Sequence, residues 1–486
     1  MPRLINRPGH FNLEYIDIIR QPLAGNSEIH NRGAALGATE ILANYGISSE
    51  SDQIPQSVIH EGKRCFINFL AVSLYASRDP SLDILLDVFK LEGGKHQSSI
   101  AGVRARTTIQ NAALANGYLG HLEDYDDTHF PTVIHPSSPT LPSSLSIGEH
   151  LSASGKDVLV ASILGMELCC RIGMAVHPHH YNEGWHITGT CGVFGSAIAA
   201  GRILGLSADQ MIAALGIAGT QASGIREVFG SMTKPFHPGR SAQSGLLATL
   251  LAQRGFTSAE TILEGRRGFG AVLSDKCDWD VATNALGERW ELQMNGLKPY
   301  ACGVVIHPLI DAMIAFRNNQ GIDYRDVRSI SAKVHPLVIE LVNRPNPRVG
   351  LEGKFSYQHS MAVGLIDGSA FPDQYTNSRV LDPDVANLRD KIDATIDPRM
   401  GEDSTEISIT LQNGTSHEET VLHATGAPEN PLSDSMLNEK FRVLSEGILP
   451  NTQIEHLLDL LWNMDQVPDI GEIMKLTRPI RRSKRS

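Results

Sequence analysis

Residues 157–176 read D-V-L-V-A-S-I-L-G-M-E-L-C-C-R-I-G-M-A-V and are apolar on nearly every side of a helix. A helix of this kind is buried all round, so it belongs in the middle of a helical bundle. Small side chains dominate residues 184–206, which lets neighbouring helices approach closely. A capping box, Ser207-x-x-Gln210, opens the helix that follows. Since no strand precedes these glycines and no G-K-[ST] follows them, the sequence predicts an all-helical domain and no phosphate-binding loop.

The pattern changes near residue 297. Residues 327–335 alternate between apolar and polar side chains, as a half-buried strand does. Residues 405–421 read as a strand, an Asn413-Gly414 turn and a second strand, which is a strong hairpin signal. We therefore expect a smaller α/β domain over residues 297–428.

Helical patterns return after residue 428, and we expect these helices to pack back on the first domain. The predicted fold class is mainly α, with a large all-helical domain interrupted by a smaller α/β lid domain. The predicted organisation is a helical domain at 1–296, the lid at 297–428, a C-terminal helical part at 429–475 and a disordered basic tail at 476–486. Residues 1–50 are expected to form an irregular arm with one short helix at 34–45.

Composition narrows the function. The chain has 486 residues and a formal net charge of −12, which argues against a general nucleic-acid binder. We find no uninterrupted apolar run of spanning length and no secretory signal, so we expect neither a membrane helix nor export. The six cysteines show no zinc-ligand spacing and fit a reducing compartment. A cytoplasmic location is expected, with a mitochondrial one as the alternative.

Titratable side chains gather at residues 121–136, H-L-E-D-Y-D-D-T-H-F-P-T-V-I-H-P, which hold four acids and three histidines. Pro131 and Pro136 stop any helix here, so the segment reads as a helix that runs into a loop. The residues displayed near this turn are Asp124, Asp126, Asp127, His129 and His135. A carboxylate beside an imidazole fixes its tautomer and raises its basicity, which suits a general base.

Cationic side chains gather elsewhere. Residues 232–240, M-T-K-P-F-H-P-G-R, read as a Pro-Gly loop just before a buried helix, and they carry Lys234, His237 and Arg240. Three cations near a helix N-terminus favour an anion site. With His186 and Lys298 as neighbours, the indicated ligand is a small polycarboxylate, although the sequence alone does not bring these segments together.

Several motifs together resemble one family. D-Y-D-D-T-H, G-W-H…G-T-C-G-V-F-G-S-A, M-T-K-P-F-H-P-G-R-S-A, K-P-Y-A-C-G and N-R-P…F-S-Y-Q follow one another across residues 50–465 as they do in the MmgE/PrpD family. This family includes 2-methylcitrate dehydratase, cis-aconitate decarboxylase and iminodisuccinate epimerase. The resemblance implies a helical domain with an α/β lid, a homodimer, and an active site between the two domains that uses no metal and no organic cofactor.

The resemblance also implies site residues. The family's positions fall on Asp124, Thr128, His135, His186, Lys234 and Lys298. An insertion in this segment leaves His129 as an alternative to His135. We expect catalytic roles for Asp124, His135, His186 and Lys234, and we expect substrate binding by Thr128, His237, Arg240 and Lys298.

The family's reactions share one step, which makes or quenches a carbanion next to a carboxylate. Cations that neutralise that carboxylate make the neighbouring proton acidic. A β-hydroxyl leaving group gives dehydration, a β-carboxylate gives decarboxylation, and reprotonation on the other face gives epimerisation. Decarboxylating members similar to the itaconate-forming enzyme of mammals carry a tyrosine at the position of Leu341, which makes decarboxylation less favoured here.

The sequence therefore favours a hydro-lyase of the 2-methylcitrate type. The alternatives are an epimerase of an imino- or amino-dicarboxylate, a cis-aconitate decarboxylase, and a non-catalytic binding protein on the same fold. A magnesium–diphosphate site at the D-Y-D-D motif is a further alternative. That alternative requires a second acidic helix motif, and the sequence contains none that we recognise.

Overall fold

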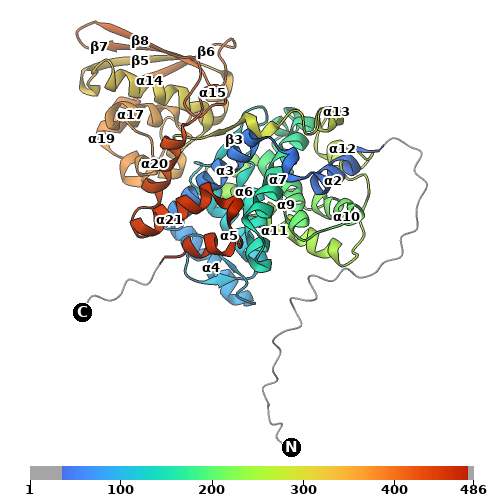
Figure 1. Ribbon diagram of the computed structural model, residues 1–486. Coiled ribbons are helices and arrows are strands. Elements are labelled where there is room, and N and C mark those ends of the chain that lie inside the picture. Colours follow the sequence, from blue (N-terminus) through green and yellow to red (C-terminus); the bar gives the residue numbers. More distant parts are fainter. Residues whose placement is uncertain (1–35, 480–486) are drawn as a thin grey trace, which may run out of the picture.

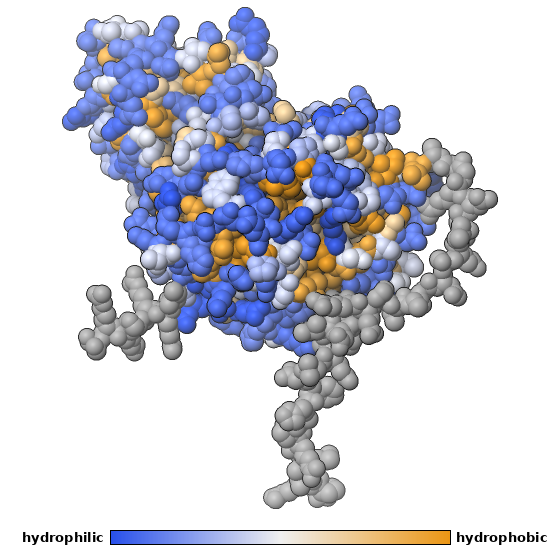
Figure 2. Space-filling model, in the orientation of Figure 1, coloured by the Kyte–Doolittle hydropathy of each residue, from blue (hydrophilic) through white to orange (hydrophobic). Residues whose placement is uncertain are grey.

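The computed structural model describes residues 36–479. Figure 1 shows a large body of packed helices with a smaller body of strands and helices on one side of it. This arrangement confirms the mainly α fold class with a smaller α/β part. Hydrophilic residues cover most of the face shown in Figure 2, with smaller apolar areas over the helical body.

The helical body holds fifteen helices among the described residues. They are α2 (Ala38–Ser48), α3 (Gln56–Ala76), α4 (Pro80–Glu92), α5 (Ile109–Leu122), α6 (Ser137–Leu151), α7 (Gly155–Val176), α8 (His179–Asn182), α9 (Ile187–Ile203), α10 (Ala208–Gly219), α11 (Thr233–Gln253), α12 (Phe269–Leu273), α13 (Trp279–Thr283), α20 (Asp434–Ser445), α21 (Asn451–Trp462) and α22 (Gly471–Leu476). A short β1 (Ser98–Ser99) pairs with β2 (Arg106–Thr107). The predicted capping box at the start of α10 is confirmed.

Helix α7 lies in the middle of this body, as its apolar sequence predicts (Figure 1). Within residues 36–479 it is the one helix long and apolar enough to cross a membrane, yet 94% of its most apolar window is buried inside the protein. Glu167 and Arg171 interrupt its apolar sequence and pair with each other at 2.6 Å. Helix α7 is therefore a core helix.

Glycines let the central helices approach one another. A Cβ atom on Gly117 of α5 would lie 2.7 Å from the Cα atom of Gly239 in α11. A Cβ atom on Gly165 of α7 would lie 2.6 Å from the carbonyl oxygen of Gly195 in α9. Any side chain at these positions would push the helices apart. The first contact matters most for function, since it sets the start of α11 beside the end of α5.

The smaller body is built on a four-stranded sheet of order β6-β5-β7-β8. Its strands are β5 (Val327–Val334), β6 (Ile392–Ile396), β7 (Thr405–Leu411) and β8 (Ser416–Val421). Strand β5 runs parallel to β6 and antiparallel to β7. The hairpin predicted around Asn413-Gly414 is confirmed by the pairing of β7 with β8. Its helices are α14 (His307–Asn318), α15 (Pro336–Val342), α16 (Gly350–Gly353), α17 (Tyr357–Asp367), α18 (Asn377–Val380) and α19 (Pro383–Arg389).

One prediction about local structure is wrong. Residues 232–240 form no loop, because α11 begins at Thr233 and carries this segment in its first turns. Pro235 is tolerated there because the first N–H groups of a helix have no partner within the helix. Pro238 lies further inside, where it removes one backbone hydrogen bond. Lys234 and His237 are therefore fixed on a rigid helix.

The predictions for the two ends of the chain have different outcomes. The short helix expected at residues 34–45 is present as α2, which ends at Ser48, three residues later than expected. The rest of the predicted arm, residues 1–35, and most of the basic tail, residues 480–486, lie outside the described residues. The domain boundaries at 296 and 428 stay a prediction.

A two-stranded ladder joins distant parts of the chain. Strand β3 (Asp127–His129) pairs antiparallel with β4 (Asn295–Leu297), and Thr128 faces Gly296. This ladder places Lys298 beside the turn that follows α5. Gly296 permits the close approach, since a Cβ atom there would lie 2.5 Å from the ring of Phe130.

Lys440 of α20 holds the same region from behind. Its buried Nζ donates to Asn68 Oδ1 at 2.7 Å, to the Tyr125 carbonyl at 2.9 Å and to the Lys298 carbonyl at 2.7 Å. Burial lowers the pKa of Lys440 well below its usual range, whereas three acceptors use all three N–H groups of the ammonium form. The side chain thus ties α20 and α3 to the two segments of the ladder.

We predict that Lys440→Met lowers the free energy of unfolding by about 2 to 4 kcal/mol, because three buried acceptors lose their donor. Urea denaturation followed by circular dichroism measures this change. The matched control is Lys90→Met, since Lys90 is exposed and pairs only with exposed Asp87. An unchanged midpoint for Lys440→Met would show that the three contacts contribute nothing to stability.

Candidate active site

A small cavity of about 60 Å³ lies where the helical body meets the lid. Its polar lining comes from the helical body and from the residue after β4: Asp124, Thr128, His135, His186, Lys234 and Lys298. All six positions that the family resemblance assigns therefore line one cavity. Their roles stay a proposal, which we argue below.

Asp124 is the centre of the cavity. Its Oδ1 accepts from Lys298 Nζ at 2.6 Å, and its Oδ2 lies 3.0 Å from Lys234 Nζ. The three side chains expose at most 8% of their surface. Burial alone would raise the pKa of Asp124, but the two ammonium groups outweigh burial and lower it well below its usual range. Asp124 has a left-handed backbone with φ of 51°, so these ion pairs also hold a strained turn.

His135 presents a defined tautomer to the cavity. Its Nδ1 lies 2.7 Å from the carbonyl oxygen of Asp127, which can only accept, so Nδ1 carries the hydrogen. The lone pair is then on Nε2. Burial lowers the pKa of His135 well below its usual value, although Asp126 at 3.4 Å opposes this shift. The ring is therefore neutral at pH 7 unless a bound anion favours its protonated form.

A buried histidine–carboxylate pair lies directly behind His135. His121 Nδ1 is 2.8 Å from Asp126 Oδ2, which also accepts from Ser138 Oγ at 2.6 Å. The ring centroid of His121 lies 4.6 Å from that of His135 and 5.7 Å from that of His186. The sequence analysis gave His121 no role. Its place at the start of the acid- and histidine-rich stretch, residues 121–136, is the signal that could have indicated one.

His186 caps the N-terminus of α9 and faces a second histidine. Its Nδ1 lies 2.9 Å from Nδ1 of His237. Burial lowers the pKa of both imidazoles, that of His237 to about 4. His186 lines the cavity, whereas His237 lies behind it and is partly exposed.

The rest of the cavity lining is largely apolar. It is formed by Val133, Tyr181, Phe229, Val304, Val305, Leu341, Val342 and Phe355. Phe229 and Phe355 each place a ring centroid 5.2 Å from Lys234 Nζ. Aromatic faces attract a cation, so these rings help to hold the buried ammonium.

Two residues considered in the sequence analysis lie elsewhere. His129 is buried between Thr132 Oγ1 at 2.7 Å and Glu291 Oε2 at 3.2 Å, and it does not line the cavity. His135, the other candidate, does line it. Arg240, expected to bind substrate, is exposed and donates to Gln243 Oε1 at 2.5 Å.

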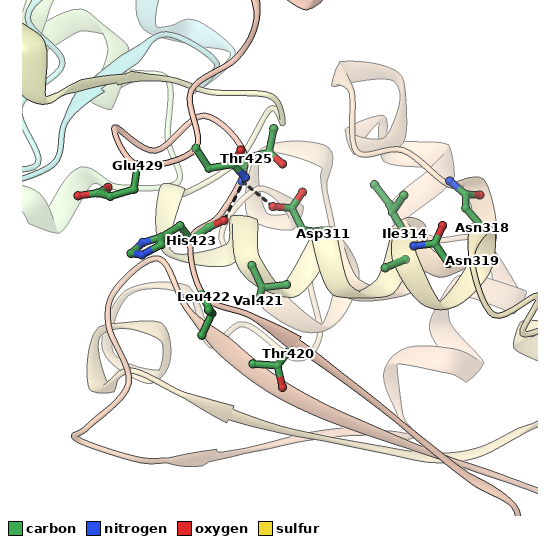
Figure 3. A pocket seen from close by; sticks show the side chains of 12 residues that line it. Asp311, Ile314, Asn318, Asn319, Thr420, Val421, Leu422, His423, Thr425 and Glu429 are labelled. Carbon is green, nitrogen blue, oxygen red and sulfur yellow. Dashed lines mark hydrogen bonds between the residues drawn. The ribbon is translucent and has the colours of Figure 1, made fainter.

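A larger hollow of about 620 Å³ lies on the surface of the lid (Figure 3). Its half-buried carboxylate, Asp311, already accepts from the Thr425 backbone N–H at 2.7 Å and from Tyr300 Oη at 2.5 Å. His423 and Glu429 lie at its exposed edge. The carboxylate of Asp311 is thus satisfied within the protein, and no lysine or arginine among residues 36–479 lines this hollow. The small cavity is therefore the better candidate site.

Four donors at the small cavity also have the spacing of a metal site. Single ligand atoms of His121, Asp124, Asp126 and His135 lie within 4.8 Å of one another. However, each oxygen of Asp124 is already paired with an ammonium group, and His135 Nδ1 donates to a carbonyl. A metal ion would have to displace these partners, so the observed donor set fits ammonium groups better.

The fold and the site together define a mainly α protein with a buried, cation-lined histidine cavity under an α/β lid. The MmgE/PrpD N-terminal domain matches residues 40–282, and the MmgE/PrpD C-terminal domain matches residues 300–466. The chain belongs to the MmgE/PrpD family.

Similar proteins include cis-aconitate decarboxylases from a fungus and from mammals. The one from Aspergillus terreus is 26% identical over 478 residues, which cover 91% of this chain and 96% of the relative. Those from Mus musculus and Homo sapiens are each 27% identical and cover 90% of this chain, with 93% and 94% of the relatives covered.

We predict that Asp124→Asn lowers the free energy of unfolding by about 3 to 5 kcal/mol at pH 7, because two buried ammonium groups lose their counter-charge. Citrate should restore part of this loss, since an anion that binds only the folded protein stabilises it. Urea denaturation with and without citrate measures both effects. Asp323→Asn, which breaks a surface pair with Arg325, is the control and should not respond to citrate. Equal stability of Asp124→Asn and wild type would remove Asp124 from the centre of the site.

Proposed function

We propose that this protein is a lyase that moves a proton at a carbon next to a carboxylate of a small polycarboxylate. Its specific reaction, in this proposal, is the dehydration of 2-methylcitrate or another alkyl-substituted citrate. The observation that supports this best is the cavity in which two ammonium groups share one carboxylate and two imidazoles complete the polar lining. We further propose that the protein acts without a metal or organic cofactor, as a cytoplasmic homodimer.

The cations explain why a polycarboxylate would bind. Lys234 and Lys298 carry two positive charges, and Asp124 cancels one of them. Of the two ammonium charges, one is not matched by Asp124, and the carboxylate of Asp126 lies 3.4 Å from His135. The ammonium groups are buried, where electrostatic attraction for a substrate carboxylate is strong. A substrate carboxylate that contacts these ammonium groups becomes an electron acceptor, so the negative charge that develops on the neighbouring carbon is stabilised.

The imidazoles explain how the proton would move. His186 removes the proton from the carbon, and the electron pair stays as an enolate. A protonated His135 then donates its proton to the leaving hydroxyl group, which departs as water while the double bond forms. Asp126, 3.4 Å from His135, favours the protonated form that this step needs. At the end of a turnover His186 holds one proton too many and His135 one too few.

The apolar wall favours an alkyl substituent on the substrate. Leu341, Val342 and Phe355 of the lid offer no hydrogen-bond donor to a third polar group. An alkyl group buried against them gains about 0.8 kcal/mol per CH₂. By the resemblance, Leu341 stands where decarboxylating members carry a tyrosine, and this difference supports dehydration.

Decarboxylation of cis-aconitate is the second candidate. It is supported by the relatives from Aspergillus terreus, mouse and human, which bear that name and match over nine tenths of this chain. In that reaction the C–C bond to a carboxylate breaks, CO₂ leaves, and a protonated imidazole gives its proton to the resulting carbanion. The same cations and histidines would serve.

A proton NMR time course in D₂O tests the reaction. We expect loss of water from 2-methylcitrate, unaffected by EDTA, and an increase in KM or loss of turnover in Lys234→Ala, because a buried carboxylate loses its charged partner. CO₂ release from cis-aconitate would instead establish the second candidate. Deuterium entering an aspartate-derived imine without net conversion would indicate an epimerase. A folded protein inert to all three would contradict the proposal.

The acid–base pair gives a pH prediction. Burial lowers the pKa of both His135 and His186 below 6.5 in the free enzyme. Above pH 6.5 His135 therefore loses the proton that it must donate, so kcat/KM should peak below pH 6.5 and fall from there toward pH 8. Bound substrate carboxylates favour the imidazolium, so the kcat profile should lie at higher pH. A kcat/KM that rises between pH 6.5 and 8, after correction for substrate ionisation, would contradict this assignment.

A further inference from the structure

We propose that His237 and His186 form a proton relay that connects the buried wall of the cavity with solvent. This inference rests on the proposed function, because that reaction leaves His186 protonated after each turnover. Only 2% of His186 is exposed and its Nδ1 contacts His237, so a proton on His186 Nδ1 reaches the exterior through His237. The relay assigns His237 a role in proton transfer rather than in substrate binding.

The geometry of the pair fits proton transfer. The two Nδ1 atoms lie 2.9 Å apart, and a contact this short between neutral imidazoles requires that one Nδ1 carries a hydrogen and the other a lone pair. Only 2% of the surface of His186 is exposed, whereas His237 is partly exposed. The pair thus spans the distance from the buried cavity wall to the outer side of α11.

The surroundings leave room for the pair and fix it. A Cβ atom on Gly224 would lie 3.1 Å from His237 Nδ1, and one on Gly189 would lie 3.2 Å from His237 Cβ. The His186 backbone N–H donates to the Gly224 carbonyl at 3.0 Å. The ring of Phe229 packs edge-on against His186 at 4.9 Å. Glycine at positions 189 and 224 therefore leaves the space that the two adjoining rings occupy.

The transfer proceeds in three balanced steps. Initially His186 Nδ1–H donates to His237 Nδ1, and His237 carries its other hydrogen on Nε2. The substrate C–H bond breaks, its electron pair stays on carbon, and the proton binds His186 Nε2. The Nδ1–H proton of His186 then passes to His237 Nδ1, and the Nε2–H proton of His237 passes to water. Both rings end neutral with the hydrogen bond between them reversed. An inward transfer then resets the pair: water gives a proton to His237 Nε2, the Nδ1–H proton of His237 returns to His186 Nδ1, and the Nε2–H proton of His186 passes through the product water to Nε2 of His135. One proton has left and one has entered, and His135 is again protonated for the next turnover.

The other histidine near His186 does not offer this outlet. His121 has its Nδ1 engaged by Asp126 and is fully enclosed, with its Nε2 buried and without a hydrogen-bond partner among residues 36–479. Its ring lies 5.7 Å from that of His186. A proton placed on His121 would stay inside the protein, so His237 is the member that reaches the exterior.

The test is buffer-dependent kinetics on the full-length protein with the substrate that wild type turns over. His237→Asn keeps a polar atom near the position of Nδ1 but cannot pass a proton through a ring. We expect kcat to fall by about tenfold or more with little change in KM. His237→Ala should fall similarly and regain activity as imidazole is added, because imidazole fits the vacated space. His237→Phe fills that space and should not be rescued.

Controls separate the outcomes. Thr233→Ala, an exposed position at the start of α11, should match wild type at every buffer concentration, and circular dichroism should show all variants folded. Wild-type kcat in His237→Asn, or a loss in His237→Ala that imidazole does not restore, would overturn the relay while the proposed function stands. Absence of wild-type turnover with every polycarboxylate would overturn both.

A second measurement does not depend on activity. In protein labelled with ¹⁵N-histidine, the relay requires one Nδ1 with a hydrogen and one without, and a scalar coupling across the shared hydrogen bond that disappears in His237→Asn. Two hydrogen-bearing Nδ1 atoms would overturn the relay.

Discussion

The shared carboxylate of Asp124 is the interaction on which the site depends. Asp124 follows α5, Lys234 lies in the first turn of α11 and Lys298 follows β4, so three distant segments meet at one buried charge. Each charge alone would be costly to bury, and the carboxylate offsets part of that cost for both ammonium groups. The backbone is held from behind as well, since Lys354 Nζ of the lid donates to the Glu123 carbonyl at 2.5 Å and Lys440 donates to the Lys298 carbonyl. Lys354 therefore links the lid to the turn that carries Asp124, and Lys440 ties α20 to the segment that carries Lys298.

Much of the fold could be predicted because its signals are local. The burial of α7 follows from apolar residues on all sides, and the β7–β8 hairpin follows from alternation around Asn413-Gly414. The start of α11 could not be predicted in this way, since Pro235 and Pro238 resemble loop residues when read without the packing that holds them. The pairing of β3 with β4 could not be predicted either, because two three-residue strands more than 160 positions apart carry no periodic signal.

The same distinction applies to the site. Residue types and the family resemblance indicated the six polar residues of the cavity. The hydrogen-bond and ion-pair partners of these residues depend on geometry that the sequence does not contain. Once residues 232–240 are helical, a turn of about 100° per residue keeps Lys234 and His237 near one face and carries Arg240 away from it. Arg240 accordingly bonds Gln243 at the surface. The contact of His237 with His186 requires both the helix and Gly224 opposite it, so no single stretch of sequence could reveal it.

Burial of the site groups has two opposite effects on the proposed chemistry. Keeping water away from the ammonium groups strengthens their attraction for a substrate carboxylate. It also keeps water away from the ring of His186, which is only 2% exposed. A buried ring bonded to a partly exposed ring meets both demands, because a proton can cross where a water molecule cannot. The more completely a bound substrate fills the space beside Leu341, Val342 and Phe355, the more the reaction depends on such a path through the wall.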